Sequence, residues 1–343
     1  MTRVGLVGCG LIGGKRAAVL REPRFDSRLV AVCDNDRARA ERLAATHGCA
    51  VEADAETLLA RPDVDLVIVA TTHDALAELT RRAIARGKHV LVEKPAARAP
   101  GELDGLAEAA RAAGVVVKVG FNLRFHPGLS RARQLFDEGA LGPLMYVRAR
   151  YGHGGRVGYE REWRARPELS GGGELVDQGV HLIDLARGFA GDFVDVAGHV
   201  GTFFWDMPVE DNGFLLLKNA GGAVAFLHAS CTEWKNLFCF EVFGRDGKLQ
   251  VDGLGGSYGV ERLTFYRMLP EMGPPETTCW EYPGEDRSWR DEYAHLLECL
   301  AGRAAPEGTL DDARAALEVV ARAYALPGHR TAPLATPRDT DGT

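Results

Sequence analysis

A glycine-rich motif near the start of the chain constrains the fold more than any other feature. Gly8-Cys9-Gly10-Leu11-Ile12-Gly13 directly follows a short apolar run and opens a helix-like stretch. In a strand–turn–helix unit, the first glycine permits a tight turn, the second lets a pyrophosphate approach the backbone, and the third lets helix and strand pack closely. Free N–H groups at the helix N-terminus can then donate to the phosphates. The motif predicts a dinucleotide site, and the alternative is an ordinary structural turn.

An acidic residue in the right place sharpens this prediction. Asp34 ends the next apolar run, 21 residues after Gly13. A carboxylate there accepts hydrogen bonds from a ribose diol and repels a 2′-phosphate, so the sequence favours NAD over NADP. Arg37 and Arg39 lie close by and could still accommodate a phosphate.

The rest of the first third repeats the strand–helix alternation. Apolar runs at 3–8, 28–33, 64–70, 89–92 and 115–119 alternate with helix-like stretches at 12–21, 36–47, 74–86 and 100–113. Such alternation predicts a doubly wound parallel sheet of the Rossmann type, with helices on both faces.

The pattern changes after Pro127. A helix is expected at 128–139, and longer alternating runs follow, joined by turns such as 219–222 and 245–247 that are typical of antiparallel hairpins. We therefore expect an α/β protein whose second part is an α+β domain with a large, mainly antiparallel open sheet and two late helices, at 288–302 and 310–325. The predicted domains are residues 1–124, which bind NAD, and 125–327, which bind substrate and form the oligomer. A flexible tail is expected at 328–343.

Composition excludes several classes of function. The 343 residues carry a formal charge of −7 and no long run of Lys or Arg, which argues against nucleic acid or an anionic membrane surface as partner. No apolar stretch reaches the roughly 18 residues of a membrane span, and no secretion signal is recognisable, so we expect a cytoplasmic protein. Seven cysteines without C-x-x-C spacing suggest neither disulfides nor zinc, and no metal is expected.

One candidate for chemistry follows the fourth strand expected in the parallel sheet. Glu93, Lys94 and Pro95 stand at the carboxyl end of the 89–92 run, where open α/β sheets bind ligands. A lysine at the mouth of a nucleotide site can hydrogen-bond the oxygen of a reacting alcohol. The alternative is a solvated surface lysine.

A second candidate lies in the segment 170–184. Three glycines lead into an amphipathic helix on which Asp177, His181 and Asp184 are spaced i, i+4 and i+7, so we expect them on one face. Histidine titrates near neutral pH and an aspartate can orient it, so the pair suits proton transfer from a hydroxyl. Alternatively, Asp177 caps the helix while His181 is a core residue, or the polar face holds a metal.

Together these motifs resemble the glucose–fructose oxidoreductase / inositol dehydrogenase / MocA family. The resemblance covers most of the chain and rests on the Gly8 motif, Val69-Ala-Thr71, Gly87-Lys-His-Val-Leu-Val-Glu-Lys-Pro95, Val119-Gly-Phe-Asn-Leu-Arg-Phe-His-Pro127, Trp163-Arg164 and residues 171–184. The chain departs from the common pattern at Thr72 and Leu76, where many members carry Pro and His.

The resemblance implies a set of site residues. Lys94, Asp177 and His181 would form the catalytic group, and Pro95 would follow a cis peptide bond. The expected cofactor contacts are Gly8, Gly10, Leu11, Ile12, Gly13, Asp34, Thr71, Glu93, Lys94, Asn122, Trp163 and Arg164. The expected substrate contacts are Lys94, Arg124, His153, Arg156, Tyr159, Asp177 and His181. The open sheet would pair subunits into a homodimer or homotetramer.

The resulting hypothesis is an NAD-dependent dehydrogenase. It would move a hydride between the nicotinamide and a secondary alcohol carbon of a sugar, an inositol-like cyclitol or a nucleotide-activated sugar. His181, oriented by Asp177, would take the hydroxyl proton while Lys94 hydrogen-bonds the same oxygen, and Lys94 and His181 can share one proton network. The alternatives are a glycosidase or epimerase that cycles a retained NAD, and a non-catalytic sugar-sensing regulator on the same scaffold.

Overall fold

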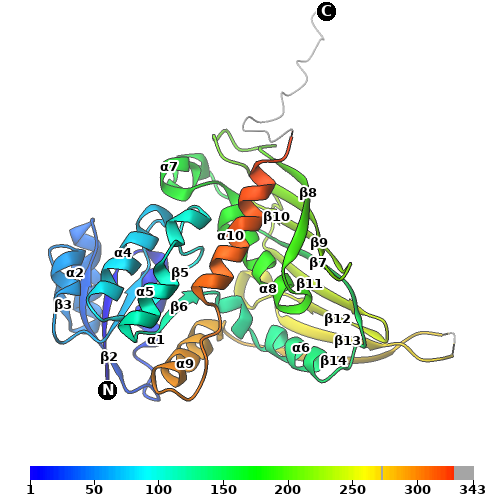
Figure 1. The fold of residues 1–343 in the computed structure, drawn as a ribbon, viewed down its shortest axis with the longest axis horizontal. Coiled ribbons are helices and arrows are strands. Elements are labelled where there is room, and N and C mark those ends of the chain that lie inside the picture. Colours follow the sequence, from blue (N-terminus) through cyan, green and yellow to red (C-terminus); the bar gives the residue numbers. More distant parts are fainter. Residues whose placement is uncertain (272, 328–343) are drawn as a thin grey trace, which may run out of the picture.

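Two sheets organise the chain in the computed structural model, which describes residues 1–271 and 273–327. Figure 1 shows sheet A with its helices on one side of the molecule, sheet B on the other and helix α10 (Leu310–Tyr324) between them. The expected α/β architecture, with a parallel sheet followed by a larger, mainly antiparallel one, is confirmed. The predicted flexible tail, 328–343, lies outside the described residues.

Sheet A is six-stranded and entirely parallel, with the order β3-β2-β1-β4-β5-β6. The order reverses between β1 and β4, and ligands of such sheets bind at this point, beyond the carboxyl ends of the strands. Its strands are β1 (Thr2–Val7), β2 (Ser27–Cys33), β3 (Ala50–Val51), β4 (Leu66–Val69), β5 (His89–Glu93) and β6 (Val117–Gly120). Its helices are α1 (Leu11–Val19), α2 (Arg37–His47), α3 (Ala55–Leu59), α4 (His73–Ala85) and α5 (Leu106–Ala113).

Sheet B is eight-stranded, with the order β14-β13-β12-β11-β7-β10-β9-β8, and only the β7–β10 pair is parallel among its described pairings. The strands are β7 (Leu144–Gly152), β8 (Phe193–Gly201), β9 (Asn212–Asn219), β10 (Val224–Ser230), β11 (Leu237–Gly244), β12 (Gly247–Asp252), β13 (Glu261–Arg267) and β14 (Glu276–Tyr282). Both predicted hairpin turns join antiparallel neighbours, β9 to β10 and β11 to β12.

Helices cover one face of sheet B. Helix α6 (Pro127–Asp137) contacts β12, β13 and β14, while α8 (Val180–Ala190) lies on β7 and β10, and α10 on β8. The strands follow this arrangement residue by residue, since Leu215 and Leu217 are buried under the helices and Leu216 is exposed on the opposite face. Each Leu or Val side chain fully buried in this way contributes about 2 kcal/mol of hydrophobic free energy.

Several elements escape the sequence patterns. β13 and β14 carry charged and polar residues at many positions, and the Leu175–Gly179 segment forms a π-helical turn instead of the start of a regular α-helix. Helix α9 (Ser288–Leu300) falls within the predicted second domain, yet Tyr293 and Leu296 join the core beneath sheet A. Its position beside the N-terminal elements is visible in Figure 1.

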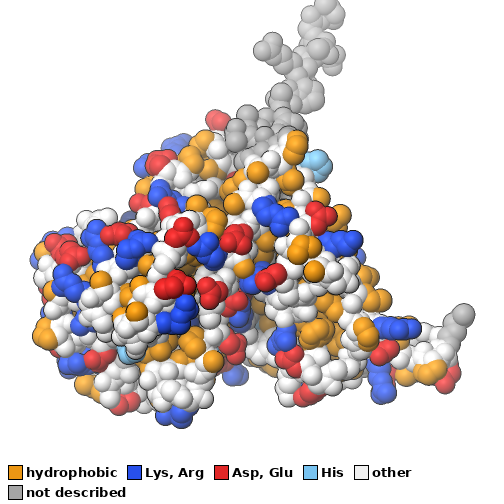
Figure 2. Space-filling model, viewed as in Figure 1, with side chains coloured by type: hydrophobic (Ala, Val, Ile, Leu, Met, Phe, Trp, Pro, Cys, Tyr) orange, Lys and Arg blue, Asp and Glu red, His pale blue; other side chains and the backbone are white. Residues whose placement is uncertain are grey.

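The surface carries charges of both signs. On the face seen in Figure 2, Lys and Arg side chains alternate with Asp and Glu over the N-terminal half and over α10. No described helix is long and apolar enough to cross a membrane.

Candidate active site

A large cleft lies between the two sheets, with a volume of about 1680 Å³. The loops that follow β1, β2, β4 and β5 in sheet A form one half of its lining. The other half is formed by Lys94, by residues from the end of β7, the 153–164 segment and the start of α8, and by lining residues within 122–126, 236–258 and 284–289. We call the lining residues 7–93 the cofactor half and the lining residues 94–289 the substrate half.

The three glycines of the first motif have three different surroundings. Gly8 has φ +95°, and a Cβ there would lie 2.4 Å from the carbonyl oxygen of Ala70. A Cβ on Gly13 would lie 1.9 Å from the carbonyl oxygen of Gly8, so the helix can pack only on a bare backbone. A Cβ on Gly10 would meet nothing within 4 Å and would project into open space. Gly10 therefore leaves the N-terminus of α1 open to a pyrophosphate, as an NAD-binding motif requires.

The rest of the cofactor half suits the same ligand. The Asp34 carboxylate accepts hydrogen bonds from the backbone N–H of Cys9 at 2.6 Å and of Asp36 at 2.7 Å, which fixes it at the end of β2 beside the glycine loop. Lys15 and Arg42 also line this half, and neither has an Asp or Glu partner within 4 Å among the described residues. The Lys15 ammonium lies over the Trp289 ring, 5.1 Å from its centroid. These cations are available to the negative charge of a dinucleotide.

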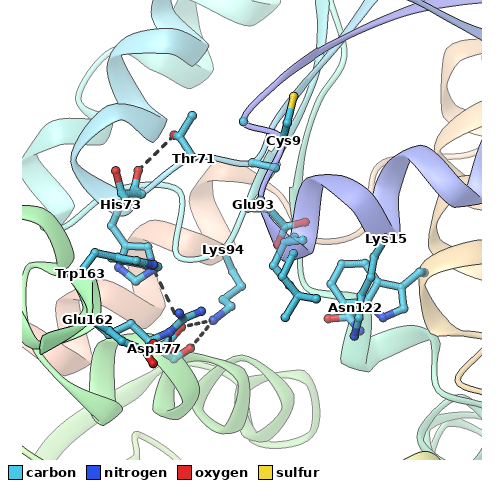
Figure 3. Close-up of a pocket in the computed structure, with 18 of the residues that line it drawn as sticks. Cys9, Lys15, Thr71, His73, Glu93, Lys94, Asn122, Glu162, Trp163 and Asp177 are labelled. Atoms are coloured by element: carbon cyan, nitrogen blue, oxygen red, sulfur yellow. Dashed lines mark hydrogen bonds and ion pairs between the residues drawn. The ribbon is translucent and has the colours of Figure 1, made fainter. Parts of the chain in front are cut away.

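Lys94 lies at the centre of the cleft, at the end of β5. Its ammonium forms an ion pair with the Asp177 carboxylate and donates a 2.7 Å hydrogen bond to the Asp177 carbonyl oxygen. Arg164 Nε donates to the second oxygen of the same carboxylate at 2.7 Å. Burial opposes ionisation of Asp177, but Lys94 and Arg164 outweigh it and hold the pKa of that carboxyl well below its usual value. Figure 3 shows Lys94 and Asp177 pointing toward each other across the cleft. The peptide bond from Lys94 to Pro95 is cis, as expected.

His181 lines the cleft from the first turn of α8. Its ring lies edge-on to Phe121 and Tyr151, with ring centroids 6.0 and 6.1 Å away, and its Nδ1 is buried without a hydrogen-bond partner among the described residues. Burial, followed by the charge of Lys94, holds the pKa of the imidazole well below its usual value. His181 is therefore a neutral ring at neutral pH.

The expectation that Asp177 orients His181 is not met. Both oxygens of the Asp177 carboxylate bond to cations, Lys94 and Arg164, and no hydrogen bond joins it to His181. Nor do Asp177 and Asp184 serve one site, because Asp184 forms its ion pair with Arg124. The π-helical turn at Leu175–Gly179 explains the difference, since it adds a residue to the turn and rotates Asp177 away from regular i, i+4, i+7 register. Asp177 does not cap α8 either, as no side-chain cap is formed there.

Glu210 holds the glycine-rich loop that precedes this turn. Its carboxylate accepts hydrogen bonds from the N–H groups of Gly173 at 2.9 Å and Leu175 at 3.0 Å, and from the Tyr324 hydroxyl at 2.7 Å. A Cβ on Gly173 would lie 1.9 Å from the Glu210 carbonyl oxygen, so this position requires glycine. The three glycines thus allow close packing that positions Asp177.

Other expected cofactor residues also line the cleft. Glu93 is buried, and its carboxylate accepts a 2.6 Å hydrogen bond from Arg16, whose guanidinium also pairs with Glu292 of α9. The predicted contact of Glu93 with a cofactor therefore competes with a structural ion pair. The remaining expected contacts that line the cleft are Leu11, Ile12, Thr71, Asn122 and Trp163.

The expected substrate residues divide into two groups. His153, Arg156 and Tyr159 line the substrate half. Arg124 is not among the lining residues, and its guanidinium is bound to Asp184 at 2.5 Å and Asp312 at 3.3 Å.

Two carboxylates that the sequence patterns did not single out bind the substrate-half residues. Glu174 lies 3.5 Å from His153 Nε2 and accepts a 3.4 Å hydrogen bond from the Tyr159 hydroxyl. Burial opposes protonation of His153, but Glu174 outweighs it and raises the pKa of the imidazole. Glu162 pairs with Arg156 at 2.5 Å. The sequence carries no spacing signal for either contact.

His73 is the site residue that the sequence patterns missed most clearly. It is buried at the start of α4, donates from Nδ1 to the Ser170 carbonyl oxygen at 2.8 Å and places Nε2 3.9 Å from the Asp177 carboxylate. Its ring lies edge-on to Trp163, with centroids 4.8 Å apart (Figure 3). Burial lowers the pKa of His73 to about 4. Only its place after a strand of sheet A could have indicated a role.

The described residues contain no group of three or more His, Cys, Asp or Glu side chains placed to hold a metal ion. All the cysteines among the described residues are free thiols.

Comparison with known proteins matches both parts of the chain to one family. Residues 2–121 match the oxidoreductase family with an NAD-binding Rossmann fold, and residues 129–250 match the GFO/IDH/MocA C-terminal domain.

Individual relatives agree with this match. The chain is 30% identical to dTDP-3,4-didehydro-2,6-dideoxy-alpha-D-glucose 3-reductase of Saccharopolyspora spinosa, over 73% of this chain and 74% of that protein. It is 26% identical to scyllo-inositol 2-dehydrogenase (NAD(+)) of Bacillus subtilis strain 168, over 92% and 91% of the two chains. The crystal structure of an oxidoreductase domain protein from Kribbella flavida superposes with a TM-score of 0.85 at 29% identity, covering 94% of this chain and 96% of the other.

Proposed function

Because the chain belongs to the Gfo/Idh/MocA family of NAD-binding oxidoreductases, we propose that it oxidises a secondary alcohol of a sugar or cyclitol, or reduces the corresponding ketone. The enzyme class and the NAD-binding fold are those of the family. The choice of alcohol carbon and the roles of individual residues are our proposal.

One observation in the cleft is the main support for this proposal. A lysine ammonium held by Asp177 and a neutral imidazole, His181, line the same cleft, beyond the end of β5 and next to the open N-terminus of α1. A hydroxyl between them would meet one donor and one proton acceptor while its carbon faces the cofactor half.

The proposed chemistry divides between cofactor and chain. Bound NAD supplies the acceptor for the hydride that leaves the alcohol carbon as its C–H bond breaks and the carbonyl forms. His181 accepts the hydroxyl proton, because its low pKa keeps the imidazole unprotonated. Lys94 donates a hydrogen bond to the same oxygen and stabilises the negative charge that develops there. Asp177 is a positioning residue that holds Lys94 in place.

A substrate screen tests the proposal. We expect NADH formation, followed at 340 nm, with at least one member of a set of free hexoses, glycosides, amino sugars, inositols and nucleotide sugars. In His181→Asn, kcat should fall at least about 100-fold while the affinity for NADH is unchanged, because only proton transfer is removed. His47→Asn, at the C-terminal end of α2 and outside the cleft lining, is the matched control. Full turnover by His181→Asn would remove His181 from the mechanism.

The same screen separates a dehydrogenase from an enzyme that returns the hydride to its own substrate. Stoichiometric NADH release supports the dehydrogenase, whereas product formed without NADH release would establish a retained cofactor. Binding of sugar and NADH with no chemistry in any combination would instead establish a sensor.

Subunit pairing is proposed through the open face of sheet B. Tyr146, Leu216 and Phe226 are at least 40% exposed on this face, and Leu216 and Phe226 are register partners on adjacent strands. An exposed apolar patch of this kind is typical of an interface, and we propose a homodimer or homotetramer acting in the cytoplasm. Light scattering on Leu216→Asp checks this, and an unchanged mass would contradict it.

A further inference from the structure

Each described lysine and arginine of the substrate half forms an ion pair with a carboxylate. Its lysine and arginine residues within the described chain are Lys94, Arg156 and Arg164. Each has a carboxylate partner: Lys94 and Arg164 share Asp177, and Arg156 pairs with Glu162 at 2.5 Å. His153 is likewise within 3.5 Å of Glu174.

The pairs made by the buried carboxylates Asp177 and Glu174 would be costly to break in favour of a ligand phosphate, whereas the Arg156 side chain is 67% exposed and its pair with Glu162 is weak. Asp177 and Glu174 are only 3% and 2% exposed, so each would remain as a buried negative charge if its partner turned toward a substrate anion. Leaving a buried carboxylate without its cation is strongly unfavourable, and one new contact between that cation and a ligand phosphate would not offset this cost. We therefore expect Lys94 and Arg164 to stay paired with Asp177 and not to turn toward an anionic group of the substrate.

Further negative charge lines the same half. Glu285 and Asp286 border the cleft, and neither has a Lys or Arg partner within 4 Å among the described residues. Asp286 instead lies 3.5 Å from His126 Nε2 and accepts hydrogen bonds from Ser288 Oγ at 2.6 Å and Trp289 Nε1 at 2.9 Å. A ligand anion beside these carboxylates would meet repulsion, which the Lys15 ammonium of the cofactor half, 5.1 Å from the centroid of the Trp289 ring, offsets only in part.

The cofactor half provides an internal comparison. There, Lys15 and Arg42 are without carboxylate partners, beside a glycine loop with open N–H groups. Among the described lining residues, the lysines and arginines without carboxylate partners therefore belong to the cofactor half, where a pyrophosphate is expected. What the substrate half offers instead is neutral hydrogen-bonding groups, those of Tyr159, Gln178, Asn236, Ser257 and Tyr258.

We infer that the substrate is a polyhydroxylated ring that carries no phosphate, diphosphate or carboxylate group. This inference rests on the proposed function for its place in the cleft. It separates the chain from a relative such as the Saccharopolyspora spinosa reductase, whose name specifies a dTDP-linked sugar.

Matched pairs of substrates test the inference by turnover. We would compare glucose with glucose 6-phosphate and UDP-glucose, and myo-inositol with an inositol monophosphate, each at saturating NAD. For any ring that is oxidised, kcat/KM of the neutral member should exceed that of its anionic counterpart at least about tenfold, and its KM should not change between 20 and about 300 mM salt. Equal or faster turnover of a phosphorylated or nucleotide-linked member would overturn the inference.

A binding measurement keeps the test independent of turnover. UDP-glucose and inorganic pyrophosphate are titrated calorimetrically into protein saturated with NADH, so that the cofactor half is already filled. We expect no binding below about 1 mM, and a tighter dissociation constant would overturn the inference. If no polyol is oxidised and the anions still fail to bind, the proposed function fails while the inferred exclusion of anions stands.

A charge variant adds a positive control. Glu162→Gln frees the guanidinium of Arg156 at the mouth of the substrate half, so UDP-glucose should bind at least about fivefold tighter than to the wild type. Glu160→Gln is the matched control, because Glu160 pairs with Arg161 and does not line the cleft. If Glu162→Gln binds UDP-glucose no more tightly than the wild type and Glu160→Gln do, the role assigned to the Arg156–Glu162 pair is contradicted.

Discussion

The two halves of the cleft use charge in opposite ways. The cofactor half presents open backbone and unpaired cations: Gly10, the N-terminus of α1, and Lys15 and Arg42 without carboxylate partners among the described residues. In the substrate half, every described Lys or Arg is held by a carboxylate. With the proposed substrate, one acidic protein would bind a dinucleotide and still disfavour anionic substrates, because the local pairing of charges matters more than the net charge.

The largest effect is expected at Lys94. In Lys94→Met, kcat should fall about 1000-fold, since the donor to the reacting oxygen is lost and Asp177 keeps only Arg164. The affinity for NADH, measured by fluorescence titration, should change less than about threefold. Lys94→Arg should recover part of the rate, and a rate loss matched by an equal loss of NADH affinity would contradict the division into halves.

Two glycines of one motif should respond differently to the same added methyl group. Gly13→Ala places a Cβ against the Gly8 carbonyl oxygen and should lower the free energy of unfolding by about 2 kcal/mol or more. Gly10→Ala has room and an ordinary φ of −73°, so the Tm should be retained while the dissociation constant for NADH rises about tenfold. Thermal melts and NADH titrations check both, and an unchanged NADH affinity in Gly10→Ala would contradict the assignment of the open space.

Asp34 tests cofactor choice within the cofactor half. In Asp34→Ser, the ratio of kcat/KM for NADPH to that for NADH should rise about tenfold, because a carboxylate that repels a 2′-phosphate is removed. Steady-state kinetics with both cofactors provide the measurement. Comparable turnover of NADPH and NADH by the wild type would overturn the preference for NAD.

His73 connects the two halves and makes the smallest predicted difference. Its pKa is about 4 in the folded protein against an ordinary 6.5, so between these values the unfolded chain binds one more proton. This group's contribution to stability is therefore present above pH 6.5 and is lost as the pH falls toward 4. In His73→Asn, the slope of the unfolding free energy over that window should be smaller by about 1 kcal/mol per pH unit. Urea unfolding at several pH values measures it, and an identical slope would contradict the assignment.

Most of the fold could be predicted because its signals are local. The alternation of apolar and polar residues indicates the strands of sheet A and strands such as β9, where Leu215 and Leu217 are buried. The polar residues of β13 and β14 hide that signal, and nothing local indicates that Tyr293 of α9 joins the core under sheet A. Such packing depends on contacts between residues far apart in the chain.

The sequence by itself determined the NAD-binding motif and brought Lys94, Asp177 and His181 into consideration, because each belongs to a short pattern with its own chemistry. Only the tertiary structure decided which charges meet. It pairs Asp177 with Lys94 and Arg164 rather than with His181, commits Arg124 to Asp184 outside the cleft, and adds His73 to the site. The physical reason is that ion pairs and buried hydrogen bonds act over a few ångströms of space, and a π-helical turn or a distant loop can redirect them without a trace in residue spacing.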